Sequence, residues 1–407
     1  MTRLAAPRLG GPVAAVVAVF TISRLAAYDS GVRFDASPLL TYAWHTIDRD
    51  LLRHRLLESL FYLHSQPPGY NALLGVAMKA FPDRPEVALH AVYVVFGLVH
   101  AIAGRVLLTC TVAVAATAFL VGKNIVLFGV PSTSSWAGMN LAEVVFSQVP
   151  LDERRELVEQ GAISKISLIE PFRWPGDYLG IVPRPRPRGV PLLDRLGTEA
   201  EPNLHNEIMV GASKQYFRDA VRLISLRPGA YATAVALSLG LYARPPSDLA
   251  YVADNRFRLG AFARAYDRFV LLQTKPGEPS WTIVLGHTLA LLYGMWLTAR
   301  LLLRRAQSTA RAVLLAYVWL TLAYATVLIG LVQISENQRL RFLVDTFAVI
   351  LVAAAFRDAV AWTRNRRARQ SEGAAHAGGA GDEIFPVLDR TSEACGGGRP
   401  SGRPLLA

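Results

Sequence analysis

Three apolar segments in the last third of the chain constrain its fold more than any other feature. They cover residues 281–303, 312–334 and 342–362. A helix needs about 20 residues to cross the hydrocarbon layer of a bilayer, and each segment reaches that length. The sequence therefore predicts an α-helical polytopic membrane protein.

Basic residues around these segments indicate their orientation. Arginine is concentrated in the loop 304–311 and in the tail that begins at Arg364. Because Lys and Arg accumulate in cytoplasmic loops, both stretches are expected inside. Residue 280 and the short polar loop 335–341 are then expected outside.

The N-terminal part of the chain is expected to add further spans. Residues 12–27 are apolar and follow a basic start. A signal peptide is the alternative, but the polar residues 28–30 offer no small-residue cleavage site, which favours a retained anchor. Residues 28–68 then form a first outer loop. The apolar stretch 70–81 and the long run 87–121 are expected to cross inward and outward, which gives about six spans in total.

Both ends of this count place residues 122–280 outside, as an extracytoplasmic domain of mixed, mainly helical structure. Residues 151–160 carry charges at helical spacing, and residues 213–226 form an amphipathic pattern. The apolar stretch near 229–243 is too short to cross a membrane, so an interfacial helix is expected there.

The chain is thus expected to have four parts. Residues 1–121 hold the N-terminal spans and the first outer loop, and residues 122–280 form the outer domain. Residues 281–362 hold three spans. The tail, residues 363–407, is rich in Gly, Ser, Arg and Ala, and we expect it to be disordered and cytoplasmic.

Composition agrees with a membrane protein and argues against a nucleic-acid partner. Apolar residues make up 52% of the chain and charged residues 18%, whereas soluble proteins carry about 25% charged residues. The net charge of +12 is explained by basic cytoplasmic loops, and no helix-turn-helix, zinc finger or basic aromatic sheet motif accompanies it. Cys110 and Cys395 lie in unlike surroundings, so no disulfide framework is expected.

The first outer loop holds the densest set of polar residues. It contains Asp29 and Asp35, and a histidine-rich stretch at 45–64. An enzyme that transfers a group to a hydroxyl needs a base for that hydroxyl and cations for the leaving phosphate. Asp35 is the first candidate for the base and Asp29 the second. The alternative is that both carboxylates only cap turns or helices.

Three motifs resemble the C-type (GT-C) superfamily of membrane glycosyltransferases. An Asp in the first outer loop, here Asp35, is followed by HSQPPGYNALLG, residues 64–75. The polar loop SENQRLRF, residues 335–342, precedes the last span, and GKNIVLFGVPSTSSWAGMNL, residues 122–141, resembles the start of the outer domain in some members. This superfamily includes the protein O-mannosyltransferases and the bacterial lipid A aminoarabinose transferases.

The resemblance implies a hexosyl- or pentosyltransferase that uses a polyprenyl-phosphate sugar as donor. Asp35 would activate the acceptor hydroxyl of a glycan, lipid or protein at the outer face of the bacterial plasma membrane. Membrane lipid and the lipid-linked sugar would be its partners. Five further residues would contact the donor or neutralise its phosphate: His64, Gln66, Lys123, Arg339 and Arg341.

Two alternatives remain open at this level. Members of the superfamily have more spans than the six expected here, and the missing ones would fall between about Gly104 and Gly122, so the chain could be a truncated, inactive homologue. A transporter subunit is the second alternative, because charged residues within spans mark ion paths. The sequence is taken to support no metal site, and a requirement for a divalent cation stays undetermined.

Overall fold

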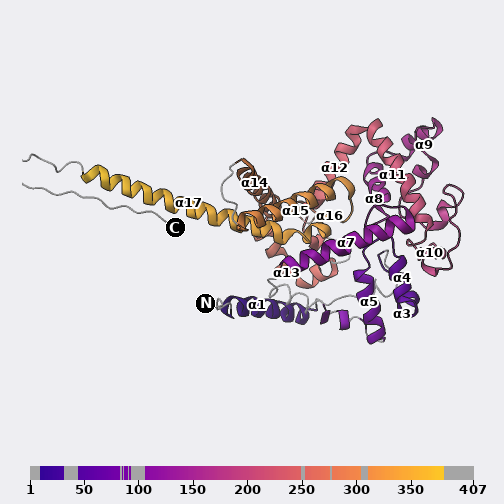
Figure 1. Ribbon diagram of the computed structural model, residues 1–407, viewed down its shortest axis with the longest axis horizontal. Helices are drawn as coiled ribbons and strands as arrows, with labels where there is room; N and C mark the ends of the chain where they lie inside the picture. The colour runs from indigo at the N-terminus through magenta and orange to yellow at the C-terminus, as the bar shows by residue number, and fades with distance from the viewer. Residues whose placement is uncertain are drawn as a thin grey trace, which may run out of the picture. The chain divides into compact units, whose positions relative to one another are not determined.

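A computed structural model describes most of the chain: residues 10–31, 45–82, 85, 87–89, 91–92, 106–248, 253–275, 277–303 and 310–379. These residues are mostly helical and form no strand; the described extended pairings are two isolated bridges, Leu179 with Val182 and Gly197 with Pro202 (Figure 1). The chain divides into two compact units, Met1–Val352 and Ala353–Ala407.

Three described helices are long and apolar enough to cross a membrane, which makes the chain a helical membrane protein. They are α14 (Trp281–Leu303), α15 (Ala310–Val332) and the part Asp345–Gln370 of α17 (Asp345–Gly379). They agree with the three C-terminal spans predicted from apolar length. The last helix continues through the arginine-rich start of the tail, which was expected to be disordered, as far as Gly379.

The N-terminal helices differ more from expectation. Helix α1 (Gly10–Asp29) covers the predicted anchor. Helix α5 (Gly69–Ala80) has only 12 residues, about 18 Å of helix, and does not reach across a bilayer by itself. Helix α7 (Val106–Phe128) runs past the expected boundary at residue 121. The part of the long apolar run at 93–105 lies outside the described residues.

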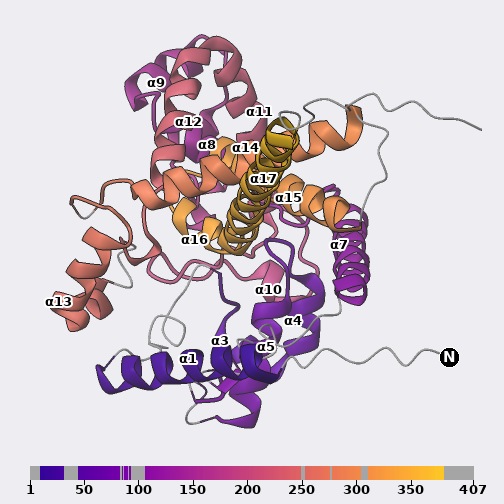
Figure 2. The same ribbon diagram turned by 90° about the vertical axis from the view of Figure 1, so that its left-hand side faces the viewer.

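One hydrophobic core joins the helices of the predicted outer domain. It is built around α8 (Ala137–Phe146) and α11 (Ile208–Leu226), which pack side by side (Figure 2). Helix α11 forms because Tyr216, Ala220 and Leu223 recur at helical spacing and are fully buried. The shorter elements around this pair are α9 (Leu151–Glu159), η1 (Lys165–Leu168) and η2 (Pro175–Tyr178).

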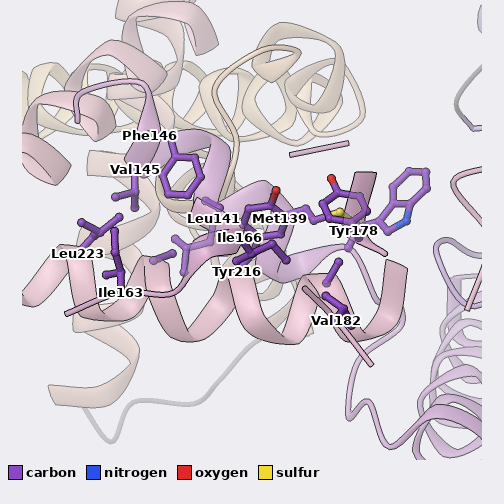
Figure 3. Packing of buried hydrophobic residues seen from close by; sticks show 14 of the residues in the cluster. Met139, Leu141, Val145, Phe146, Ile163, Ile166, Tyr178, Val182, Tyr216 and Leu223 are labelled. Atoms are coloured by element: carbon purple, nitrogen blue, oxygen red, sulfur yellow. The ribbon is translucent and has the colours of Figure 1, made fainter. Parts of the chain in front are cut away.

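Close contact between α8 and α11 depends on one glycine. A Cβ at Gly138 would lie 1.9 Å from the Ser213 carbonyl oxygen, so no larger residue fits without separating the helices. The Gly138 amide donates to the Ser213 hydroxyl at 3.1 Å. Figure 3 shows Phe146 of α8 and Tyr216 of α11 directed into the shared core.

A second core ties the first outer loop to this domain. It contains buried leucines of α3 (Arg49–His54), α4 (Leu56–Tyr62) and α5, packed with residues of α10 (Pro191–Asp194). The Asp48 carboxylate caps α3 by accepting from the amides of Asp50 and Leu51. The segment 45–80 is therefore part of the folded body that contains residues 128–226.

Helix α12 (Pro228–Tyr242), which coincides with the predicted interfacial helix, packs along α15 and α16 (Asn337–Phe342). The Ser238 hydroxyl donates to the Gln333 carbonyl at 2.7 Å, and the Asn337 amide donates to the Ser238 carbonyl at 2.9 Å. Beyond α12 the chain forms η3 (Pro246–Asp248) and α13 (Ala253–Phe269) before it enters α14.

Candidate functional site

The segment 63–66, which leads into α5, is fixed by the buried imidazole of His64. Its Nε2 lies 2.8 Å from the His205 carbonyl oxygen, and its Nδ1 lies 2.6 Å from the Ser135 hydroxyl. A carbonyl only accepts, so Nε2 carries the proton and Nδ1 accepts from the hydroxyl. Both ring nitrogens are used within the protein, and they connect this segment to two distant parts of the chain.

The imidazole of His205 repeats this arrangement. Its Nδ1 lies 2.7 Å from the Ser65 hydroxyl and its Nε2 lies 3.2 Å from the Thr46 carbonyl oxygen. Burial lowers the pKa of His64 to about 3 and the pKa of His205 to about 4. Both rings are therefore neutral at pH 7, which is the state that these hydrogen bonds require.

Residues in the last turns of α7 hold the same segment from another side. The Lys123 ammonium donates to the Leu63 carbonyl. The Asn124 amide donates to the Ser132 carbonyl at 2.8 Å. Helix α7, the turn that follows it and the segment 63–66 therefore form one hydrogen-bonded unit, and Lys123 is part of that unit.

Gln66 lies at the partly exposed edge of this unit. Its side-chain amide donates to the His45 carbonyl, and the Asn71 amide donates to the same carbonyl at 3.1 Å. The ring of His45 lies 5.6 Å from the ring of Trp136, centroid to centroid. Gln66 and His45 are both half-buried, so their polar atoms border solvent.

Two charged residues at the start of α16, Glu336 and Arg339, act on this edge. Glu336 and Arg339 form an ion pair of 2.7 Å. Burial lowers the pKa of the His45 imidazole, and the positive charge of Arg339 lowers it further, while Glu336 acts in the opposite direction. The start of α16 and His45 therefore interact electrostatically, although His45 lies in the N-terminal part of the chain and α16 in its C-terminal part.

Glu143, on α8, adds a carboxyl group to this edge. It is half-buried. Burial raises the pKa of the Glu143 carboxyl, and the negative charges of Glu336 and Glu170 raise it further. A carboxyl whose pKa is raised in this way can take up and return a proton closer to neutral pH.

These residues make up what we call the polar cluster: His45, Gln66, Glu143, Glu336 and Arg339. Arg339 offers a guanidinium that suits an anion such as phosphate. Glu143 and neutral His45 can exchange protons with a hydroxyl. The cluster therefore suits a reaction in which an anionic group leaves and a hydroxyl loses its proton.

Arg341 lies in a different, fully buried environment. Its Nε donates to the Asp345 carboxylate at 3.0 Å, and its Nη1 donates to the Arg244 carbonyl at 2.8 Å. His287 of α14 lies 3.3 Å from the same carboxylate. Arg341 thus joins the ends of α12, α14 and α17, whereas Arg339, two residues earlier, belongs to the polar cluster.

Of the two candidate bases, Asp35 and Asp29, the structure describes only Asp29. Asp35 lies outside the described residues. Asp29 is the exposed last residue of α1, and among the described residues no hydrogen bond or ion pair links it to the polar cluster. Their proposed roles stay predictions.

Glu143 was not singled out from the sequence, although a signal for it exists. It is the single charged residue in the apolar stretch AGMNLAEVVF, residues 137–146. A carboxyl in such a stretch must be partly buried when the helix packs, and burial is what shifts its pKa.

Metal binding and similarity to known proteins add no further assignment. Within the ranges that the structure describes, no three His, Cys, Asp or Glu side chains come together to hold a metal ion. No protein-family model, curated protein or solved structure matches the chain. The contacts of the polar cluster are therefore the basis for a functional proposal.

Proposed function

We propose that this chain is a glycosyltransferase that moves a sugar from a polyprenyl-phosphate donor to a hydroxyl acceptor at the outer face of a bacterial plasma membrane. One observation carries the proposal: the charges of Glu336 and Arg339 act on His45, whose carbonyl is bound by Gln66. Two motifs that resemble the GT-C superfamily, far apart in sequence, thereby contribute to one polar cluster. The cluster also includes Glu143, with its raised pKa.

In this proposal the reaction is a displacement at the anomeric carbon. The Asp35 carboxylate takes the proton of the acceptor hydroxyl, and the acceptor oxygen forms the new bond to the anomeric carbon. The bond from that carbon to the lipid phosphate oxygen breaks, and Arg339 stabilises the departing phosphate. An in-line attack of this kind inverts the anomeric centre. Glu143 and Gln66 bind and orient the sugar hydroxyls.

The proposal includes a membrane arrangement finer than the three described spans. About six spans would place residues 122–280 and the polar cluster on the outer side, where the head group of a lipid-linked sugar would be presented. His64 and Lys123 would then act by holding the segment that carries Gln66, since their polar atoms bond within the protein.

The experiment is sugar transfer from radiolabelled polyprenyl-phosphate donors in membranes that contain the full chain. We expect transfer in the wild type and its loss in Asp35→Asn and in Glu143→Gln, with unchanged membrane insertion. Asp29→Asn is the matched control and should retain transfer. Transfer that survives in Asp35→Asn would refute the role of that base, and an absence of transfer from every donor would favour the truncated, inactive homologue.

A transporter is the second candidate, and the cluster around Asp345 favours it. His287 of α14 and Asp345 of α17 lie in two helices able to span the membrane, and Asp345 pairs with Arg341 of the preceding α16. Such groups mark ion paths in transporters. A transporter should show substrate flux that is lost in Asp345→Asn and retained in Asp35→Asn, which is the reverse of the pattern expected for the enzyme.

A further inference from the structure

Helix α13 presents a row of exposed aromatic side chains. Phe262, Tyr266 and Phe269 follow one another at spacings of four and three residues, so they share one face of the helix. Their exposed fractions are 68%, 46% and 75%, and the rings of Phe262 and Tyr266 stack with centroids 6.4 Å apart. Arg264 and Arg268 lie on the opposite face and are also exposed.

Hydrogen bonds place the end of this helix beside the start of a candidate span. The Ser280 hydroxyl donates to the Leu271 carbonyl at 2.6 Å, and the Thr282 hydroxyl donates to the Val270 carbonyl at 2.5 Å. Trp281, the first residue of α14, is 58% exposed. The residues that follow Phe269 therefore lie at the level of the first turn of α14.

That level corresponds to a membrane surface if α14 spans the bilayer. Aromatic residues are enriched where spans enter the headgroup region, and Trp281 occupies such a position. A helix with an aromatic face and a basic face lies in the plane of this region, with its apolar side toward the acyl chains. The basic side then faces the lipid phosphates and water.

We propose that α13 is an interfacial helix whose aromatic face inserts into the leaflet at the N-terminal end of α14, with Arg264 and Arg268 at the level of phospholipid phosphates. Continuity with α14 and the charge of the two arginines both identify a phospholipid surface as the occupant. The bend at Gly260, whose φ is 45°, separates the aromatic half of α13 from the residues before it (Figure 2).

The packing of α12 differs from that of α13. Helix α12 is the segment in which an interfacial helix was expected, but it is bonded to the neighbouring elements through Ser238 and Tyr242. Its Tyr242 hydroxyl lies 2.9 Å from the Thr326 hydroxyl of α15. The aromatic side chains of Phe262, Tyr266 and Phe269 on α13 are exposed, which makes α13 the better candidate for contact with lipid.

The test uses site-directed spin labelling of the full chain in vesicles of phosphatidylcholine and phosphatidylglycerol. Cys110 and Cys395 are replaced by serine, and a nitroxide is attached to single cysteines. One series labels the aromatic face at 262, 266 and 269. The matched series labels the basic face at 261, 264 and 268, which are exposed as well. Power saturation then measures collision of each label with oxygen, which enters lipid, and with a water-soluble nickel complex.

We expect the oxygen-to-nickel collision ratio to be several-fold higher at every position of the aromatic face than on the basic face. Equal, high access of nickel to both faces would mean that the helix lies in water and would overturn the proposal. Low access of both reagents to the aromatic face would mean that protein covers it, for example a second copy of the chain, and would overturn it equally. All six positions are exposed, so labelling them leaves the packed cores intact.

Discussion

Acidification should destabilise the fold through His64 and His205, and the size of the effect follows from their surroundings. Each ring donates from Nε2 to a carbonyl and accepts at Nδ1 from a serine hydroxyl. A second proton on either ring would remove the acceptor and place a charge in the interior. Burial lowers the pKa of His64 to about 3 and that of His205 to about 4, below the value of about 6.5 in an unfolded chain.

Because both pKa values are lower in the folded state, the unfolded chain takes up protons that the folded chain cannot. The stability that the neutral rings provide is complete above about pH 6.5 and is lost as the pH falls toward the folded pKa values. Between pH 7 and pH 5 each histidine should cost about 2 kcal/mol, so the pair should cost about 4 kcal/mol. That loss is comparable with the whole stability of many domains.

The assay is thermal unfolding of the purified chain in detergent at pH 7 and pH 5. For a folded domain of roughly 150–250 residues, a loss of about 4 kcal/mol corresponds to a fall in the midpoint of about 10 °C. His64→Gln keeps a donor toward the His205 carbonyl but does not titrate, so it should be less stable at pH 7 and show about half the pH dependence. His54→Gln is the control, since His54 is exposed. Equal pH dependence in the wild type and His64→Gln would refute the reasoning.

Two further predictions concern packing and charge. Gly138→Ala should destabilise the chain by about 3 kcal/mol, because the new Cβ would overlap the backbone of α11. Gly240→Ala is the control and should be neutral or stabilising, because no atom lies within 4 Å of its Cβ. Equal thermal midpoints for the two variants would contradict the packing argument. Arg341→Ala should lower the midpoint by the equivalent of about 3 kcal/mol, since it leaves the Asp345 carboxylate without its buried partner. Arg339→Ala removes a half-exposed ion pair, so it should cost less than about 1 kcal/mol of stability and should lower sugar transfer instead. A larger loss of stability in Arg339→Ala than in Arg341→Ala, with sugar transfer retained, would contradict the assignment of the two arginines.

The C-terminal spans could be predicted from the sequence because apolar length alone determines them. Residues 281–303 and α14 coincide, and α15 differs from its prediction by two residues at each end. The segment 70–81 was harder, because its apolar residues look the same whether they face lipid or a protein core. Leu74, Ala77 and Met78 are buried against leucines of α3 and α4, partners that local sequence does not reveal.

Only part of the polar cluster could be predicted, because contacts with residues distant in sequence do not show in the local sequence. Gln66 and Arg339 stand in short motifs with recognisable chemistry, so they could be singled out. Arg341 stands in the same motif as Arg339, and only the three-dimensional arrangement separates its buried contacts from those of its neighbour. Glu143 gains its raised pKa from burial and from Glu336; its apolar neighbours indicate the burial, but nothing in the residues beside it reveals Glu336.

The short helix α16 fixes the number of residues that can connect α15 to α17, because its two faces make different contacts. Asn337 and Arg341, four residues apart, bond into the bundle, while Glu336 and Arg339, three apart, belong to the polar cluster. Inserting or deleting one residue would turn the helix by about 100° and move both sets away from their partners together. The order Glu-Asn-x-Arg-x-Arg, followed four residues later by Asp345, is therefore a spacing rule, and chains that share this architecture should keep it even where their other loops have changed length.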